Sequence, residues 1–78
     1  MTKNEFIKIY LDDSKKMELI DRFGWAPESV DLENIINESF SDVLENFIGV
    51  DGLIDEDNFS FREFNNDLEL LIEEKIGG

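Results

Sequence analysis

Residues 32–48 read LENIINESFSDVLENFI, and they carry the clearest periodicity in the sequence. Apolar side chains recur three and four positions apart, the spacing that lines one face of an α-helix. Asp31 stands where an N-cap is needed, and Gly49 stands where a helix commonly ends. The segment therefore predicts an amphipathic helix, with an apolar stripe made of Leu32, Ile35, Ile36, Phe40, Val43, Leu44, Phe47 and Ile48.

The C-terminal segment predicts a second long helix. Residues 51–58 begin with an Asp-Gly turn and continue as an acidic loop, and residues 60–63 (SFRE) have the form of a capping box. Phe59 and Phe64 fit the hydrophobic staple that flanks such a box. We expect the helix to fray at residues 77–78. Its apolar face is expected to hold Phe61, Phe64, Leu68, Leu71, Ile72 and Ile76.

Two shorter helices are predicted before the tryptophan. Residues 2–5 (TKNE) form a capping box that opens the first, whose apolar face holds Phe6, Ile9 and Tyr10. A helix continued past Leu11 would place Asp13 on that face, so we expect a break with Asp13 as the next N-cap. Gly24 is expected to end the second helix. The apolar face of that helix is expected to hold Met17, Ile20 and Phe23.

The fold class follows from these four segments. No stretch alternates polar and apolar residues at the period of two that strands require. We therefore predict an all-α fold, a compact bundle of four helices with two short N-terminal helices and two longer amphipathic ones. Residues 1–78 are expected to form a single acidic α-helical domain, since 78 residues lie near the lower limit for an independent core.

The composition argues against catalytic and metal chemistry. The sequence contains no cysteine and no histidine, so it lacks a thiolate, the commonest general base and the commonest transition-metal ligand. It also has no Gly-rich phosphate loop and no Ser/His/Asp set. We expect a protein that is not an enzyme and that uses no cofactor and no metal. No apolar run reaches membrane-spanning length, and a cytoplasmic location is expected.

The net charge of −13 is unevenly distributed along the chain. Residues 1–24 carry five basic and five acidic side chains, whereas residues 25–78 carry two basic and fifteen acidic ones. Such a surface attracts cationic partners and repels both nucleic acid and anionic membranes. The sequence therefore predicts a basic protein surface as the partner, with no direct binding of nucleic acid or membrane.

The acidic side chains fall on the outward faces of the last two predicted helices and on the loop between them. Residues three or four apart on a helix are separated by about 5–6 Å along its axis, which is comparable with the spacing of phosphates along a strand. We interpret these carboxylates as phosphate surrogates that enter a Lys/Arg-lined groove, with a merely solubilising acidic face as the alternative. The predicted binding residues are Glu38, Asp42, Glu45, Asp55, Glu56, Asp57, Glu63, Asp67, Glu74 and an apolar anchor, Leu70.

The functional hypothesis is a small inhibitor of a basic nucleic-acid-processing protein that acts as a DNA or RNA mimic. In size, charge and lack of catalytic residues, the chain is similar to phage-encoded anti-defence proteins, including anti-CRISPR proteins. Residues 2–6 are similar to the first helix of helical immunity proteins, which implies the alternative of a protein that neutralises one toxin. That family has a paired-tyrosine motif, whereas Tyr10 is the only tyrosine here.

Two further resemblances imply other modules. Residues 32–76 have the helix–loop–helix outline of an EF-hand, with Glu63 as the final calcium ligand, although Gly52 stands where the first oxygen ligand belongs. Asp13 and Ser14 resemble the phosphopantetheine attachment site of acyl carrier proteins, although lysines follow where that family has an apolar residue. Both alternatives predict a measurable change: a calcium-dependent thermal shift or a mass addition at Ser14.

Overall fold

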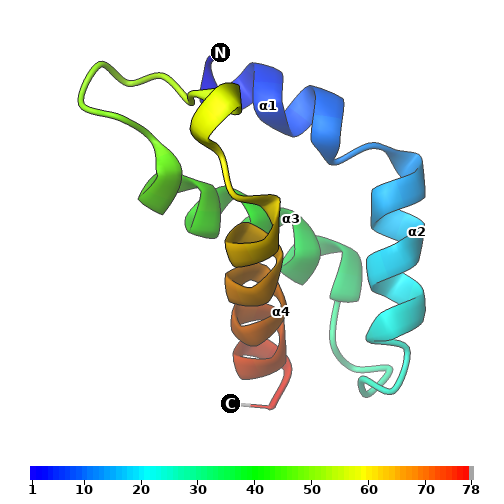
Figure 1. The fold of residues 1–78 in the computed structure, drawn as a ribbon. Helices are drawn as coiled ribbons and strands as arrows, with labels where there is room; N and C mark the ends of the chain where they lie inside the picture. The colour runs from blue at the N-terminus through cyan, green and yellow to red at the C-terminus, as the bar shows by residue number, and fades with distance from the viewer. Residues whose placement is uncertain (78) are drawn as a thin grey trace.

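The computed structural model describes residues 1–77, and within that range it contains four α-helices and no strand (Figure 1). The α-helices are α1 (Lys3–Tyr10), α2 (Asp13–Arg22), α3 (Leu32–Leu44) and α4 (Phe61–Gly77). Two short 3₁₀ helices separate α3 from α4, namely η1 (Glu45–Phe47) and η2 (Glu56–Asn58). The predicted all-α arrangement of two short and two longer helices is confirmed. None of the helices in residues 1–77 is long and apolar enough to cross a lipid bilayer.

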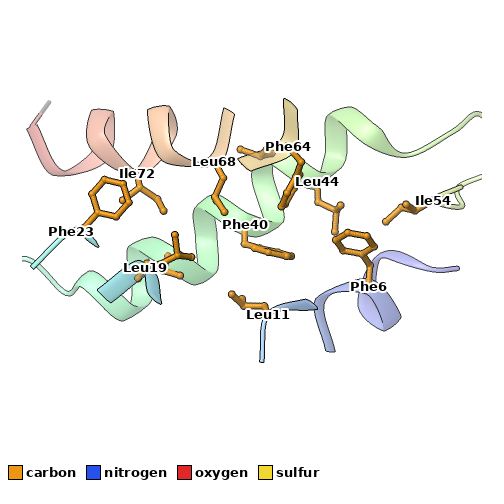
Figure 2. Packing of buried hydrophobic residues seen from close by; sticks show 12 residues of the cluster. Phe6, Leu11, Leu19, Phe23, Phe40, Leu44, Ile54, Phe64, Leu68 and Ile72 are labelled. Carbon is orange, nitrogen blue, oxygen red and sulfur yellow. The ribbon is translucent and has the colours of Figure 1, made fainter. Parts of the chain in front are cut away.

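The core lies between α3 and α4, and α1 and α2 pack against the rest of α3. Figure 2 shows side chains from all four helices pointing into one cluster. The rings of Phe40 and Phe64 meet edge-on at its centre, with their centroids 4.9 Å apart. The stripe predicted for residues 32–48 is confirmed, because all its members are buried or half-buried. The buried apolar residues are Phe6, Leu11, Leu19, Phe23, Ile36, Phe40, Val43, Leu44, Ile54, Phe64, Leu68 and Ile72.

The capping box that opens α1 is confirmed. The Glu5 backbone N–H donates to the Thr2 hydroxyl at 3.2 Å, and the Thr2 backbone N–H donates to the Glu5 carboxylate at 3.3 Å. The hydrogen bonds from the Thr2 side chain and backbone lower the pKa of Glu5. The box therefore contributes stability that is present at neutral pH and is lost as the pH falls through that lowered pKa.

The break after α1 is also confirmed, but the predicted cap of α2 is wrong by one residue. Asp12, not Asp13, is the N-cap: its carboxylate accepts a hydrogen bond from the Lys15 backbone N–H at 2.9 Å. Leu11 is drawn into the core, with 7% of its surface exposed. The chain turns directly after Leu11, so the first of the two aspartates takes the capping position.

The predicted apolar face of α2 is partly wrong. Phe23 is buried as expected, but its partner on the inner face is Leu19, and 65% of Met17 and 39% of Ile20 are exposed. Leu19 and Phe23 lie four positions apart and so point in nearly the same direction from the helix. Two faces of α2 are apolar, and the one that contains Leu19 packs against the core.

Two other residues assigned to apolar faces are more exposed than predicted. Ile9 on α1 is 52% exposed and Phe61 at the start of α4 is 41% exposed. Phe61 still contacts the ring of Tyr10, at a centroid distance of 5.1 Å. Ile9 lies in the last turn of α1 and Phe61 is the first residue of α4, so both are close to a helix end.

Glycine does not end the helices as predicted. Among the described residues only Gly52 has a positive φ, +78°, so neither Gly24 nor Gly49 adopts the left-handed conformation of a helix stop. α2 ends at Arg22, with Phe23 as its C-cap, and the Phe23 N–H donates to the Leu19 carbonyl at 2.9 Å. α3 continues directly into η1. Gly77 is helical rather than frayed, and Gly78 lies outside the described residues.

The loop between η1 and η2 has a defined conformation. The predicted turn is confirmed, since the Gly52 N–H donates to the Gly49 carbonyl at 3.0 Å and Asp51 accepts from the Leu53 N–H at 3.0 Å. The Ile54 N–H donates to the Met1 carbonyl at 2.7 Å, and the Met1 nitrogen donates to the Ile54 carbonyl at 2.9 Å. Figure 1 shows the N-terminal end beside this segment. The loop is therefore fastened to the start of α1.

The start of α4 follows the predicted pattern in part: the hydrophobic staple and one of the two hydrogen bonds of the capping box form, but within residues 1–77 the Ser60 backbone N–H does not donate to the Glu63 carboxylate. The Ser60 hydroxyl accepts a hydrogen bond from the Glu63 backbone N–H at 3.3 Å. The rings of Phe59 and Phe64 lie 5.4 Å apart, as a hydrophobic staple requires. These two contacts fix the direction in which α4 leaves the loop, and hence the direction in which its outer face points.

Ser39 on α3 gives a prediction for stability. Its hydroxyl is fully buried and has no hydrogen-bond partner among the described residues. A Ser39→Ala substitution removes an unsatisfied polar atom, so we expect the free energy of unfolding to rise by about 1 kcal/mol. A Ser39→Leu substitution adds volume to a packed position and is expected to lower it by about 1–3 kcal/mol. Urea unfolding measures both; a Ser39→Ala variant less stable than the parent would contradict this account.

Candidate functional site

The predicted acidic residues of α3 and η1 are exposed, but Glu38, Asp42 and Glu45 each lie close to a lysine. The Lys75 ammonium from α4 lies 3.7 Å from the Glu38 carboxylate and 3.1 Å from the Asp42 carboxylate. Lys3 from α1 forms an ion pair with Glu45. Because these carboxylates are already close to a cation, their attraction for an external cation is reduced.

The acidic residues of α4 are placed differently. Glu63, Asp67 and Glu74 are exposed, and no ion pair within residues 1–77 involves any of them. Leu70 lies on the same side of the helix and is 63% exposed. We call these four residues the α4 surface. It combines free carboxylates with an uncovered apolar side chain, opposite the buried face of Phe64, Leu68 and Ile72.

One acidic residue beside the α4 surface is neutralised by α2. Arg22 at the end of α2 forms an ion pair with Glu69, which lies between the α4 surface and the core. Arg22, Glu69 and Leu70 also line a shallow, open depression on this side of the molecule. The α4 surface is therefore bordered by a fixed ion pair on the side that faces α2.

The predicted acidic residues of the loop have separate roles. Asp55 caps η2, because its carboxylate accepts from the Asp57 backbone N–H at 3.1 Å and from the Asn58 side-chain nitrogen at 2.6 Å. Glu56 accepts a hydrogen bond from the Tyr10 hydroxyl at 2.9 Å. Asp57 is exposed. The loop therefore presents one carboxylate used for capping, one oriented by a tyrosine and one that faces solvent.

The Tyr10–Glu56 bond predicts a difference in pH dependence. The hydrogen bond to Glu56 raises the pKa of Tyr10, since the neutral hydroxyl is the donor. Its contribution to stability is complete below about pH 10 and is lost as the pH rises through the raised pKa. We expect the melting temperature of the parent to fall more steeply above about pH 10 than that of a Tyr10→Phe variant. Parallel thermal melts across this range measure it; identical slopes would contradict the prediction.

The sequence alone does not identify which cations neutralise part of the acidic surface. Lys3 pairs with a carboxylate 42 positions further along the chain, and Arg22 pairs with one 47 positions further along. The two partners of Lys75 lie 33 and 37 positions before it. No local pattern predicts such contacts, because the crossing of the helices brings the partners together. Within residues 1–77 there is no group of three or more carboxylates arranged to hold a metal ion.

No family model matches the chain, and no curated protein or solved structure gives a significant match.

Proposed function

We propose that this protein binds a basic surface of a nucleic-acid-processing protein and inhibits it by offering carboxylates in place of phosphates. The observation that carries the proposal is the α4 surface, where Glu63, Asp67 and Glu74 are exposed and free of ion pairs within residues 1–77. A charge that is not neutralised internally is available to a cationic partner. The net charge of −13 adds a long-range field of the same sign.

The geometry of α4 suits an extended row of cations. The four-residue step from Glu63 to Asp67 corresponds to about 6 Å along the helix axis, and the seven-residue step from Asp67 to Glu74 corresponds to about 10 Å more. These steps are comparable with one and two phosphate spacings along a strand. The helix is held by its packing on α3, so little conformational freedom is lost when a partner binds.

The acidic residues outside α4 have a supporting part in this proposal. Glu38, Asp42 and Glu45 are held near lysines, and we assign to them a contribution to the field rather than direct contacts. Asp55, Glu56 and Asp57 lie in the segment before α4 and extend the acidic surface beyond its N-terminal end. Association of such a surface with a cationic groove is expected to be fast and to weaken with salt.

Phage anti-defence proteins, including anti-CRISPR proteins, are the class with which this activity agrees, and we propose that the protein acts in the cytoplasm. An immunity-type protein that neutralises one toxin is the second candidate. The observation that favours it is the 63% exposure of Leu70, because a specific interface is often centred on an apolar anchor. For that candidate, Leu70→Ser would abolish binding as completely as removal of the charges.

Capture of the partner and competition with nucleic acid test the proposal. The protein is immobilised, partners from the native host are bound at low salt, and they are eluted with a salt gradient. The purified partner is then mixed with the protein in the presence of duplex DNA or RNA. We expect nucleic acid to displace the protein from the partner. Binding that is unchanged at saturating DNA and RNA would exclude phosphate mimicry and would favour the immunity-type alternative.

A further inference from the structure

A small aromatic cavity opens between α1, α2 and the start of α4. Its volume is about 120 Å³, well above the roughly 10–15 Å³ that a single water requires. Three of its lining residues, Phe6, Phe40 and Phe64, are at most 2% exposed and form its inner wall. The remaining lining residues, which are more exposed, are Tyr10, Lys15, Phe61 and Asn65.

Two aromatic rings at the entrance remain accessible. Phe61 is 41% exposed and Tyr10 is half-buried, and their ring centroids lie 5.1 Å apart with the ring planes inclined by 55°. Phe6 supports both rings from within, at 4.4 Å from Tyr10 and 6.1 Å from Phe61. The two outer rings are thus fixed in position and available to a second molecule.

The Glu56 carboxylate lies beside this entrance. The Tyr10 hydroxyl donates to Glu56 at 2.9 Å, so the Glu56 carboxylate is held at the edge of one of the lining rings. Each carboxylate oxygen can accept more than one hydrogen bond, and Glu56 forms no ion pair within the described residues. Fixed rings beside an unneutralised carboxylate are the combination that binds organic cations.

We propose that this cavity binds an arginine side chain of the partner protein, with the guanidinium stacked on Tyr10 and Phe61 and donating to Glu56. The proposal deepens the proposed function, because it identifies one contact with the cationic partner. A planar guanidinium suits this arrangement better than an ammonium, since it stacks on a ring while its edge donates to a carboxylate. Cation–π contacts operate within about 6 Å of a ring centroid. The centroids of Tyr10 and Phe61 lie 5.1 Å apart, so a single guanidinium can contact both rings.

The charge of Lys15 makes it possible to distinguish a cavity that binds a cation from one that binds an uncharged apolar group. Its ammonium lies 3.2 Å from the Asn65 side-chain oxygen and 3.7 Å from Glu18, on the side of the cavity formed by α2 and α4. A positive charge there repels an entering guanidinium and would attract a carboxylate. An uncharged guest would be indifferent to both Lys15 and Glu56. The two residues therefore give opposite effects for a cation.

The experiment is an NMR titration of the full protein with N-acetyl-arginine amide, with N-acetyl-norleucine amide as the uncharged comparison. We expect saturable shifts at Tyr10 and Phe61 with the arginine compound only. Glu56→Gln is expected to weaken its binding at least threefold, and Lys15→Met is expected to strengthen it. Glu28→Gln, which removes one exposed charge elsewhere, is the matched control and should leave binding unchanged.

Several results would overturn the proposal. These are equal binding of the norleucine compound, equal effects of Glu56→Gln and Glu28→Gln, and weaker binding by Lys15→Met, which would indicate an anion site. Phe61→Leu provides a second test, because Phe61 is partly exposed and its loss should remove binding without unfolding the protein. None of these results depends on competition with nucleic acid. Failure of the arginine site is therefore distinguishable from failure of phosphate mimicry.

Discussion

A Phe6→Ala variant is expected to lose about 3–5 kcal/mol in its free energy of unfolding. Phe6 is fully buried and is the one buried residue within α1. Its ring contacts those of Tyr10, Phe59 and Phe40, at centroid distances of 4.4, 4.8 and 6.2 Å. Removing the ring leaves a cavity where α1, the loop and α3 meet. A domain of this length is stable by only about 4–12 kcal/mol, so the variant should lose a large fraction of its total stability.

Urea unfolding followed by far-UV circular dichroism measures this effect. Ile9→Ala is the matched control, because Ile9 lies on the same helix and is 52% exposed. We expect the control to change the free energy of unfolding by less than about 1 kcal/mol. Similar losses in the two variants would show that Phe6 does not anchor α1 to the core.

Removal of the charges on the α4 surface is expected to have the largest effect on binding. In the triple variant Glu63→Gln, Asp67→Asn, Glu74→Gln, three exposed contacts at about 0.5–1 kcal/mol each are lost, so affinity for the partner should fall roughly 10–100-fold. The salt dependence of binding should become weaker at the same time. The stability of the free protein should rise slightly, because like charges on one helix face repel.

The matched control removes the same number of charges elsewhere. Asp13→Asn, Asp21→Asn and Glu28→Gln change exposed residues outside α4, so that both triple variants keep the same net charge. Isothermal titration or surface plasmon resonance with the purified partner compares them. Equal losses of affinity would mean that only total charge matters, and that the α4 surface has no special role.

The extent to which the fold is predictable differs between helices. The start and the apolar face of α3 are predicted accurately because Ile36, Phe40 and their neighbours allow only one apolar face. The α-helix ends at Leu44 and η1 follows, whereas the periodicity predicts one helix to Ile48. α2 is ambiguous, since Met17 and Ile20 on one side and Leu19 on the other are all apolar. Helix propensity and periodicity do not decide which of the two faces is buried. That choice depends on how α2 packs against α3, and hence on tertiary contacts.

The candidate site is predictable only in part, because periodicity shows which side chains point outward but not which of them meet across helices. The outward orientation of Glu63, Asp67 and Glu74 follows from the periodicity of α4 alone. The ion pairs of Lys75 with α3 and the bond from Tyr10 to Glu56 join residues at least 33 positions apart. These contacts distinguish neutralised carboxylates from free ones, and the sequence contains no local signal for them.

Carboxyl footprinting of the free and bound protein tests the central claim most directly. Carbodiimide-activated labelling followed by mass spectrometry reports the accessibility of each acidic side chain. In the free protein, Glu63, Asp67 and Glu74 should react readily, as should Asp13 and Asp21. In the complex, we expect the three residues of α4 to be protected while the two aspartates of α2 remain reactive. Protection of α2 with continued labelling of α4, or uniform labelling throughout, would contradict the claim that α4 receives the cationic partner.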